Sequence, residues 1–141
     1  MLKSSVLKTL KERPIAMSSI LLLEDTYHLL RLYTRSLVWA GHKVKPSMSV
    51  DASLDIFGHV QFDLIISDLR VGSYSVERLI KRLKQLQDGG TPVLIISAHL
   101  DSYYGLCEEN GLHNLLAKPF ENHVLLDTVT EILGRYCKSG S

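Results

Sequence analysis

The sequence contains only two cysteines, Cys107 and Cys137, which are too far apart to form a CxxC pair. Neither has another metal-ligating residue at a useful spacing. Two isolated cysteines suit a reducing compartment better than a disulfide framework. The cysteine content therefore favours a cytoplasmic location and supports neither a structural disulfide nor a cysteine-based metal site.

Long apolar runs are also missing. The longest, at residues 20–23 and 93–96, are far shorter than the roughly 20 residues that a membrane-spanning helix needs. A signal peptide is not expected either, because lysines interrupt every apolar stretch within residues 1–19. We therefore expect a soluble protein with no membrane partner.

Charge of one sign is not in excess, since 16 Lys and Arg residues face 15 Asp and Glu residues, for a formal net charge of +1. This balance provides no field that would attract nucleic acid, so we expect no direct nucleic-acid partner. The 141 residues, 45% of them hydrophobic, are enough for one domain with a core and too few for two ordinary ones.

The N-terminal stretch differs from the rest of the chain. Within residues 1–18, apolar residues recur at helical spacing among lysines until Pro14 interrupts the pattern. Because the amphipathicity is weak, a packed or frayed extension is favoured over a membrane-surface or partner-binding helix. We expect an extension at residues 1–18, a folded domain at 19–137 and a tail at 138–141.

From residue 19 onward, short apolar runs alternate with longer segments of helical period, as in βα units on a parallel sheet. Three of the runs are continuously apolar, which is typical of central strands covered by helices on both faces. The second alternates lysine with valine at residues 43–45 and therefore suits an edge. The predicted strands are residues 20–23, 42–46, 64–67, 93–97 and 114–117.

The segments between the strands carry apolar stripes at helical spacing, so each predicted helix can cover one side of the sheet. The fourth helix, at about residues 102–109, has the poorest stripe and contains Gly105, so we expect it to be the least stable. The other stripes are Leu29, Tyr33, Leu37 and Ala40; Leu54, Phe57 and Val60; Val76, Leu79, Ile80, Leu83 and Leu86; and Leu125, Val129, Ile132, Leu133 and Tyr136.

Polar side chains follow the predicted strands where the strands end. Parallel strands bring these positions to one edge of the sheet, where open α/β sheets bind ligands. Each residue alone has an ordinary explanation as a helix cap, a turn hydroxyl or a solvated lysine. Capping and chance do not readily explain the full set, which consists of Glu24, Asp25, Asp68, Ser97 and Lys118.

Three carboxylates repel one another unless a cation lies among them or one holds a proton. Oxygen ligands without His or Cys suit a hard cation such as Mg²⁺, which commonly binds phosphate oxygens as well. A carboxylate can then attack a phosphoryl group and form an aspartyl phosphate, while an ammonium and a hydroxyl stabilise the phosphoryl oxygens. The edge residues thus point to phosphoryl chemistry.

Four sequence motifs resemble those of response-regulator receiver domains of bacterial two-component systems, and the resemblance covers about residues 19–137. It implies an α/β, flavodoxin-like (βα)5 three-layer sandwich with a parallel sheet in the order 2-1-3-4-5. The motifs are LLLED at residues 21–25, DLIISDL at 63–69, VLIISA at 93–98 and AKPF at 117–120.

The resemblance implies a role for each residue of the edge. Asp68 would be the phosphoacceptor, Ser97 the switch hydroxyl and Lys118 the counter-ion of the phosphoryl group. The bond between Lys118 and Pro119 would be cis, which is inexpensive only before proline.

The implied Mg²⁺ site shares the phosphoacceptor. Asp25 and Asp68 would be direct ligands, Glu24 would act through water, and the backbone carbonyl of Arg70 would complete the site.

The chain departs from the family pattern in two places. The usual Met-Pro after the acceptor and the later Gly are replaced by residues 70–76, RVGSYSV, and the usual aromatic of the fifth strand is Leu115. Coupling between the hydroxyl and a rotating aromatic is therefore not expected in its usual form. The resemblance implies that Arg70 and His99 lie at positions that tune dephosphorylation. Two interpretations of the Arg70 side chain stay open: it covers the phosphoryl group against water, or it remains solvated.

The favoured function is a regulatory phosphoacceptor rather than a conventional enzyme, with self-phosphorylation and self-dephosphorylation as its only expected activities. A histidine kinase or phosphotransfer protein would donate the phosphoryl group, and an effector protein or domain would respond. Formation of a homodimer is a further possibility, because Leu115 and the last helix can expose apolar area.

Two other functions are less favoured by the sequence. A pseudo-receiver that signals without phosphate is suggested by Leu115 and the altered loop. A phosphatase or nucleotide enzyme is disfavoured because the chain lacks a GxGxxG or P-loop motif, and no second Asp lies two residues after Asp68.

Overall fold

The computed structural model describes residues 17–57 and 60–139. The predicted amphipathic pattern of the N-terminal extension, and Pro14, lie outside the described residues. The boundaries at residues 18 and 137 stay predictions. The side chains of Phe57 and Cys137 are likewise outside the description.

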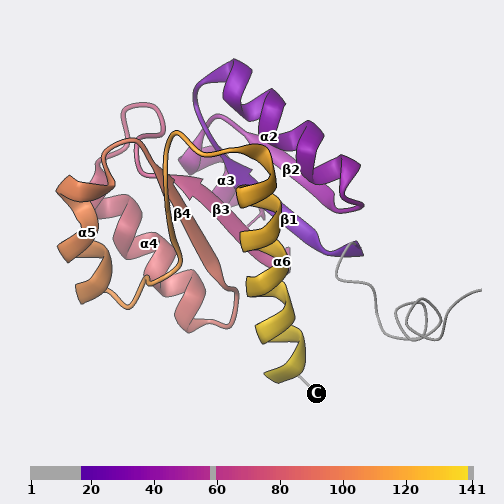
Figure 1. The fold of residues 1–141 in the computed structure, drawn as a ribbon. Helices are drawn as coiled ribbons and strands as arrows, with labels where there is room; N and C mark the ends of the chain where they lie inside the picture. Colours follow the sequence, from indigo (N-terminus) through magenta and orange to yellow (C-terminus); the bar gives the residue numbers. More distant parts are fainter. Residues whose placement is uncertain (1–16, 58–59, 140–141) are drawn as a thin grey trace, which may run out of the picture.

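A five-stranded parallel sheet forms the centre of the molecule (Figure 1). Its order, β2-β1-β3-β4-β5, confirms the predicted order 2-1-3-4-5. Each predicted strand agrees with the structure to within one residue at either end. The strands are β1 (Ser19–Leu23), β2 (Lys43–Ser47), β3 (Leu64–Asp68), β4 (Val93–Ser97) and β5 (Leu115–Ala117).

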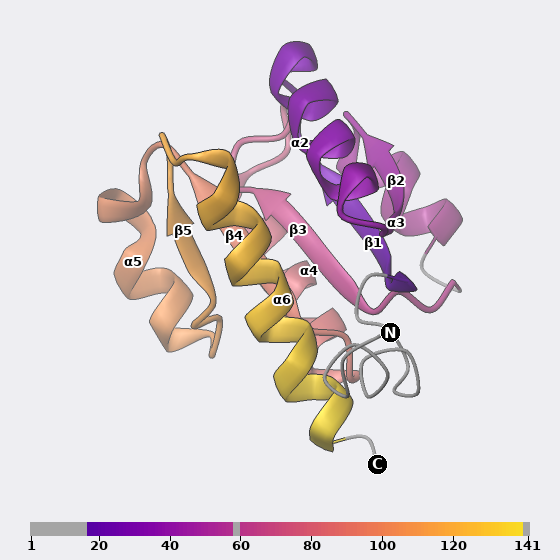
Figure 2. The ribbon, with the colours of Figure 1, turned by 45° about the vertical axis from the view of Figure 1, so that its right-hand side comes forward.

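Helices cover both faces of this sheet and complete three layers (Figure 2). Helices α2 (Tyr27–Trp39) and α6 (Asn122–Ser139) lie on one face. Helices α3 (Val50–Phe57), α4 (Val76–Asp88) and α5 (Leu100–Glu109) lie on the other. The flavodoxin-like sandwich is therefore confirmed.

The two apolar cores follow from the alternation of side chains along the strands. In β1, Ile20 and Leu22 pack with α2 and α6, whereas Leu21 and Leu23 pack with α3 and α4. Strands β3 and β4 are buried at all five of their positions. Continuous apolar runs are therefore required here, because neither face of these strands contacts water.

The outer strands are more accessible. Both lysines of β2 are exposed, and every residue of β5 is at least partly exposed. This confirms the prediction that the lysine-containing run lies at an edge. The fourth predicted helix, α5, has Cys107 as its one fully buried residue, in agreement with its weak apolar stripe.

Three positions of the predicted stripes were wrong. Val60 lies beyond the end of α3 and is 52% exposed, and Tyr136 in the last turns of α6 is also exposed. Ala40 caps α2 rather than belonging to its buried face. Periodicity identifies the face that a helix would bury, but it does not show where the helix ends or extends past the sheet.

In the part of the chain that the structure describes, we find no helix with the length and apolar character needed to cross a bilayer.

Candidate functional site

The carboxyl ends of the strands bring the predicted site residues together. Glu24 follows β1, Asp68 ends β3, Ser97 ends β4, and Lys118 follows β5. The register pairs Ser97 with Ala117, which places Lys118 one residue beyond the last pair of β4 and β5. The backbone N–H of Glu24 extends the pairing of β1 and β2 by donating to the carbonyl of Ser47 at 3.1 Å.

Lys118 connects two acidic residues that lie at the carboxyl ends of different strands. Its Nζ donates to Asp68 Oδ2 at 2.6 Å and also to Glu24 Oε1. Glu24 is fully buried, and the Lys118 and Asp68 side chains are only 10% and 11% exposed. The predicted acceptor, the predicted counter-ion and one predicted metal-site residue therefore form one buried ionic network.

Burial and pairing shift the pKa values of this network in a consistent way. Burial raises the pKa of Glu24, the hydrogen bond from Lys118 opposes that rise, and the Asp68 charge adds to it. Burial alone would lower the pKa of Lys118, but the bonds to Asp68 and Glu24 outweigh it and the pKa is raised. The ammonium therefore remains charged at neutral pH.

Asp25 contacts the loop that follows β3. Its Oδ2 accepts the backbone N–H of Gly72 at 2.9 Å, and Gly72 adopts φ +62°, a left-handed conformation that favours glycine. The backbone N–H of Arg70 donates to Asp68 Oδ1 at 3.1 Å. Val71 is buried in the core between these two contacts. The unusual loop sequence is therefore attached at two points to acidic residues of the site.

Ser97 lies next to the network but bonds elsewhere. Its buried Oγ accepts the N–H of His99 at 3.0 Å, and its carbonyl accepts the N–H of Lys118 at 2.9 Å. The peptide bond between Lys118 and Pro119 is cis, as the family resemblance implied. The structure therefore brings Ser97 to the same edge as Asp68, although no hydrogen bond joins their side chains.

One residue at the site was missed. Tyr33 of α2 was predicted as a core residue, and it is buried, but its ring also lies 5.9 Å from Lys118 Nζ. The ring stacks on Phe120, with 5.3 Å between centroids and 24° between planes. The available signal was a tyrosine in a stripe whose other members are leucine and alanine.

The donor chemistry of the site suits a hard divalent cation. Three carboxylates against one ammonium leave an excess of negative charge, and the predicted ligands offer only oxygen atoms. Glu24, Asp25, Asp68 and the Arg70 carbonyl are the residues available to hold such an ion. In this structure, however, Lys118 lies between Glu24 and Asp68, and no group of three or more His, Cys, Asp or Glu among the described residues is arranged around a metal position.

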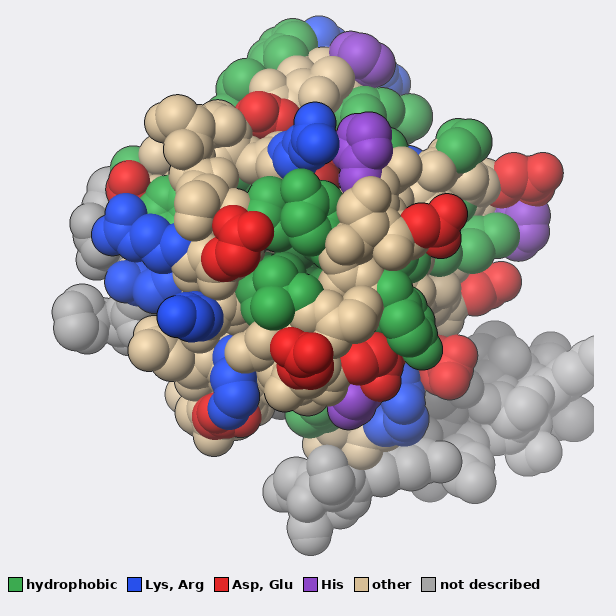
Figure 3. All heavy atoms as spheres, turned by 90° about the vertical axis from the view of Figure 1, so that its left-hand side faces the viewer, with side chains coloured by type: hydrophobic (Ala, Val, Ile, Leu, Met, Phe, Trp, Pro, Cys, Tyr) green, Lys and Arg blue, Asp and Glu red, His purple; other side chains and the backbone are tan. Residues whose placement is uncertain are grey.

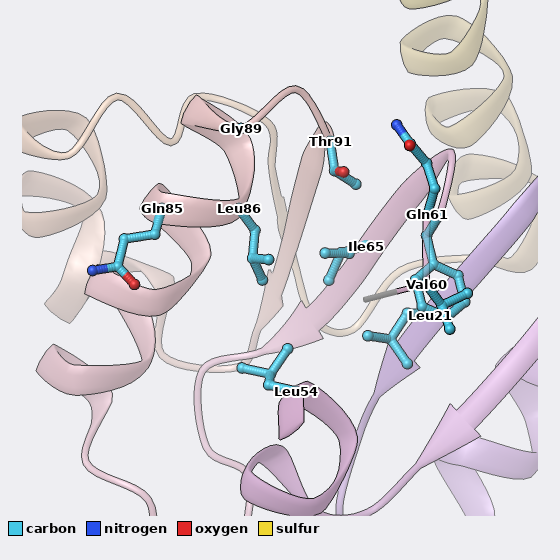
Figure 4. Close-up of a pocket in the computed structure, with 10 residues that line it drawn as sticks. Leu21, Leu54, Val60, Gln61, Ile65, Gln85, Leu86, Gly89 and Thr91 are labelled. Atoms are coloured by element: carbon cyan, nitrogen blue, oxygen red, sulfur yellow. The ribbon is translucent and has the colours of Figure 1, made fainter. Parts of the chain in front are cut away.

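A separate hollow lies at the opposite end of the sheet (Figure 4). It has a volume of about 270 Å³, and its lining includes Leu21, Ile65 and Leu86. Gln61 and Thr91, in the loops that precede β3 and β4, line it as well. This cavity is therefore distinct from the polar cluster, which lies beyond the strands' carboxyl ends.

Charge is unevenly distributed on the side of the molecule that carries α4 and α5. Figure 3 shows several Lys and Arg side chains together at one margin of this side, whereas Asp, Glu, apolar groups and a few further Lys, Arg and His side chains are spread over the remainder. The near-zero net charge therefore conceals local segregation. By sequence, α4 carries both signs, whereas the charged residues of α5 are all acidic. They are Arg78, Lys81, Arg82, Lys84, Glu77 and Asp88 in α4 and Asp101, Glu108 and Glu109 in α5.

Comparison with known sequences gives a consistent picture. The sequence model described as "Response regulator receiver domain" matches residues 20–130. The chain is 30% identical over 128 residues to the sensory/regulatory protein RpfC of Xanthomonas campestris and 30% identical over 120 residues to the response regulator ArlR of Staphylococcus aureus. The alignments cover 87% and 84% of this chain, but the chain spans only 18% of RpfC and 54% of ArlR.

Solved structures with the same fold agree. The signal receiver domain of a putative Luxo repressor protein from Vibrio parahaemolyticus superposes with a TM-score of 0.76 at 25% identity, over 88% of this chain and 95% of that one. A response regulator from Burkholderia pseudomallei with a phosphorylated aspartic acid, a calcium ion and citrate has a TM-score of 0.70 at 22% identity, over 88% and 73% of the chains.

Proposed function

Because the chain belongs to the response regulator receiver domain family, we propose that it accepts a phosphoryl group on Asp68 from a histidine kinase or a phosphotransfer protein. The family is regulatory and is not a family of conventional enzymes. The expected activities are limited to self-phosphorylation from small donors and self-dephosphorylation.

The contact between Lys118 and Asp68 is the observation that carries this proposal. A buried ammonium 2.6 Å from a buried carboxylate is arranged to neutralise charge that develops on a group attached to that carboxylate. The backbone N–H of Arg70 already approaches the other oxygen of Asp68. Either carboxylate oxygen can form the bond to phosphorus once its present hydrogen bond breaks, which is the bond from Arg70 N–H for Oδ1 and from Lys118 Nζ for Oδ2.

The proposed transfer uses the described residues in distinct roles. An oxygen of Asp68 attacks phosphorus, the bond from phosphorus to the donor breaks, and the donor histidine retains the electron pair of that bond. Lys118 then pairs with a phosphoryl oxygen instead of with Asp68. Ser97, at the end of the neighbouring strand, donates a hydrogen bond from its hydroxyl to another phosphoryl oxygen after its side chain turns from His99.

We assign Mg²⁺ binding to Glu24, Asp25, Asp68 and the carbonyl of Arg70. When bound, the ion supplies positive charge that offsets the charge of the phosphoryl oxygens. The related Burkholderia pseudomallei regulator, with its phosphorylated aspartic acid and calcium ion, supports this assignment by fold alone. The excess of carboxylates over the single Lys118 supports it from this chain.

The output and the location are also proposals. Phosphorylation would shift the populations of the conformations available to the surface of α5, β5 and α6. That surface would then contact an effector protein or domain. Residue 115 of β5 is a leucine, so a rotating aromatic at this position is not part of this change. The proposed location is the cytoplasm, and the proposed domain spans residues 19–137.

Incubation with acetyl phosphate and Mg²⁺, followed by intact mass measurement, tests the proposal. Wild-type protein should gain the mass of one phosphoryl group, and Asp68→Asn should gain none. Asp101→Asn, on the exposed first turn of α5, is a matched control and should behave as wild type. A wild-type chain that takes up no phosphoryl group would favour the pseudo-receiver, and an adduct on Asp68→Asn would place the acceptor elsewhere.

The side chain of Arg70 can be tested separately. It is exposed, and the contact that Arg70 makes with Asp68 comes from its backbone N–H, so Arg70→Ala preserves that contact. If the guanidinium covers the phosphoryl group, the acyl phosphate should decay faster in the alanine variant. An unchanged lifetime would show that the side chain is merely solvated.

A further inference from the structure

Tyr33 is a residue of α2 that reaches the site from outside the strand ends. Its ring stacks on Phe120, which lies two residues after Lys118 in the chain. The pair of rings therefore joins α2 to the segment that carries the ammonium. Tyr33 belongs to the buried core cluster formed with α2 and α6, and the partly buried Phe120 packs against that cluster.

The ring of Tyr33 is also within reach of the ammonium itself. Lys118 Nζ lies 5.9 Å from the ring centroid, inside the distance of about 6 Å at which a cation is attracted to an aromatic face. The attraction is stronger when the pair is shielded from water, and both side chains are largely buried. An ammonium has three N–H donors, and Asp68 and Glu24 accept two of them.

The charges of the site act on Tyr33 in return. Burial raises the pKa of its phenol, the Lys118 charge opposes this rise, and the charges of Glu24 and Asp68 reinforce it. Tyr33 therefore stays neutral at neutral pH. A neutral aromatic ring can attract the ammonium without competing with the carboxylates for its protons.

We propose that Tyr33 is a positioning residue, whose ring, braced by Phe120, holds the Lys118 ammonium at the acceptor while Lys118 exchanges Asp68 for a phosphoryl oxygen. This inference rests on the proposed function. The hydrogen bond from Lys118 to Asp68 is directional and must break during the exchange. Attraction to the face of a ring is less directional and persists when the ammonium moves a short way.

A purely structural role for Tyr33 makes a different prediction. Leu30 and Leu37 occupy the same buried face of α2, so a leucine at residue 33 would still supply apolar packing. It would not supply an aromatic face. Tyr33→Phe retains the face and removes only the hydroxyl, so comparison of the Leu and Phe variants separates positioning from packing.

The first measurement is the rate of phosphorylation by acetyl phosphate. We expect Tyr33→Leu to react on the order of three- to tenfold more slowly, and Tyr33→Phe to stay within roughly twofold of wild type. Leu37→Val, on the same helix face but away from Lys118, controls for lost packing and should leave the rate unchanged. Thermal unfolding confirms that each variant is folded at the assay temperature.

The second measurement does not depend on phosphorylation. In NMR spectra of the unmodified protein, the ring current of Tyr33 should shift the side-chain proton signals of Lys118 near Nζ. The shift should persist in Tyr33→Phe and disappear in Tyr33→Leu.

The outcomes are distinguishable. Equal rates in Tyr33→Leu and wild type, or equal slowing in the Leu and Phe variants, overturn the positioning role. If the wild type accepts no phosphoryl group, the proposed function fails, and the Lys118 signals alone decide whether Tyr33 holds the ammonium. Lys118 signals that are the same in Tyr33→Leu and wild type then overturn the inference.

Discussion

The interior of the sheet and its carboxyl edge are similarly buried but chemically opposite. Leu22, Ile66 and Ile96 lie inside the sheet, whereas Glu24 and Ser97 lie at its edge, and all five have little or no exposed surface. Buried apolar area stabilises the fold by about 25 cal/mol per Å². Buried charge costs free energy unless it is paired. The apolar interior therefore stabilises the fold. Part of that stability offsets the cost of burying charged groups at the carboxyl ends of the strands.

The largest effect should come from the interior. Leu22→Ala removes a fully buried side chain of β1 and leaves a cavity, so the free energy of unfolding should fall by roughly 3–5 kcal/mol. Leu32→Ala, which changes a leucine of α2 that is 53% exposed, should change it by less than about 0.5 kcal/mol. Urea unfolding followed by circular dichroism measures both. Similar losses in the two variants would contradict the contrast.

The next largest loss of stability should come from the ionic network at the carboxyl ends of the strands. Lys118→Met leaves Glu24 and Asp68 buried without their shared cation, and it should cost about 3 kcal/mol at neutral pH. Asp68→Asn should cost less, because Lys118 keeps its bond to Glu24. Urea unfolding of both variants checks this order.

The loss in Lys118→Met should depend on pH. A carboxyl group whose folded-state pKa is raised contributes stability that is present below its unfolded pKa and lost as pH rises through the folded pKa. The pKa of Glu24 is raised by burial in the wild type, and removal of Lys118 also removes the interaction that opposes the rise. Lys118→Met should therefore approach wild-type stability as the pH falls from 7 towards 4.5. A pH-independent difference would show that the ionic network is not its cause.

His42 is an intermediate case, a titratable group inside an otherwise apolar region. It is buried at the turn between α2 and β2, and its Nδ1 has no hydrogen-bond partner among the described residues. Burial lowers its pKa below 6.5, so its contribution to stability is complete above pH 6.5 and is lost as the pH falls through the folded-state pKa. His42→Leu should reduce the pH dependence in this range by at most about 1.4 kcal/mol per pH unit. Unfolding at several pH values tests this, and an unchanged slope would exclude His42.

The smallest effect should come from an exposed ion pair. Lys84 Nζ and Asp88 Oδ2 are 2.6 Å apart on α4, but their side chains are 42% and 61% exposed to solvent. Asp88→Asn should cost only about 0.3–0.5 kcal/mol, and the cost should disappear at high salt. Unfolding at low and high salt compares this pair directly with that of Lys118 and Asp68. A loss as large as that of Lys118→Met would show that burial is not what distinguishes the two.

The interior was more predictable than the edge. Apolar runs in β1, β3 and β4 indicate central strands because only buried strands need apolar residues on both faces. The residues that gather at the carboxyl edge could also be identified, since parallel strands bring Glu24, Asp68, Ser97 and Lys118 to one side. The order of the sheet came from the family resemblance, and the structure confirmed it.

Contacts that depend on side-chain conformation were not predictable. Position along the chain does not reveal that Lys118 bonds to both Glu24 and Asp68, or that Asp25 accepts the N–H of Gly72. Tyr33 was assigned to the core because helical spacing reports which face of a helix is buried, not which atom its ring approaches. Val60 and Tyr136 were misplaced for the related reason that the spacing continues beyond the part of each helix that meets the sheet.

The backbone bond from Glu24 to Ser47 has a consequence for the timing of local opening. Ser47 ends β2, the accessible outer strand, while Glu24 is fully buried and contacts Lys118. The amide of Glu24 is therefore protected from deuterium exchange only as long as the end of β2 stays paired. Transient fraying of that strand would loosen the chain beside the ionic network, so exchange at this single amide reports how often the outer strand β2 disturbs the network of Glu24, Lys118 and Asp68.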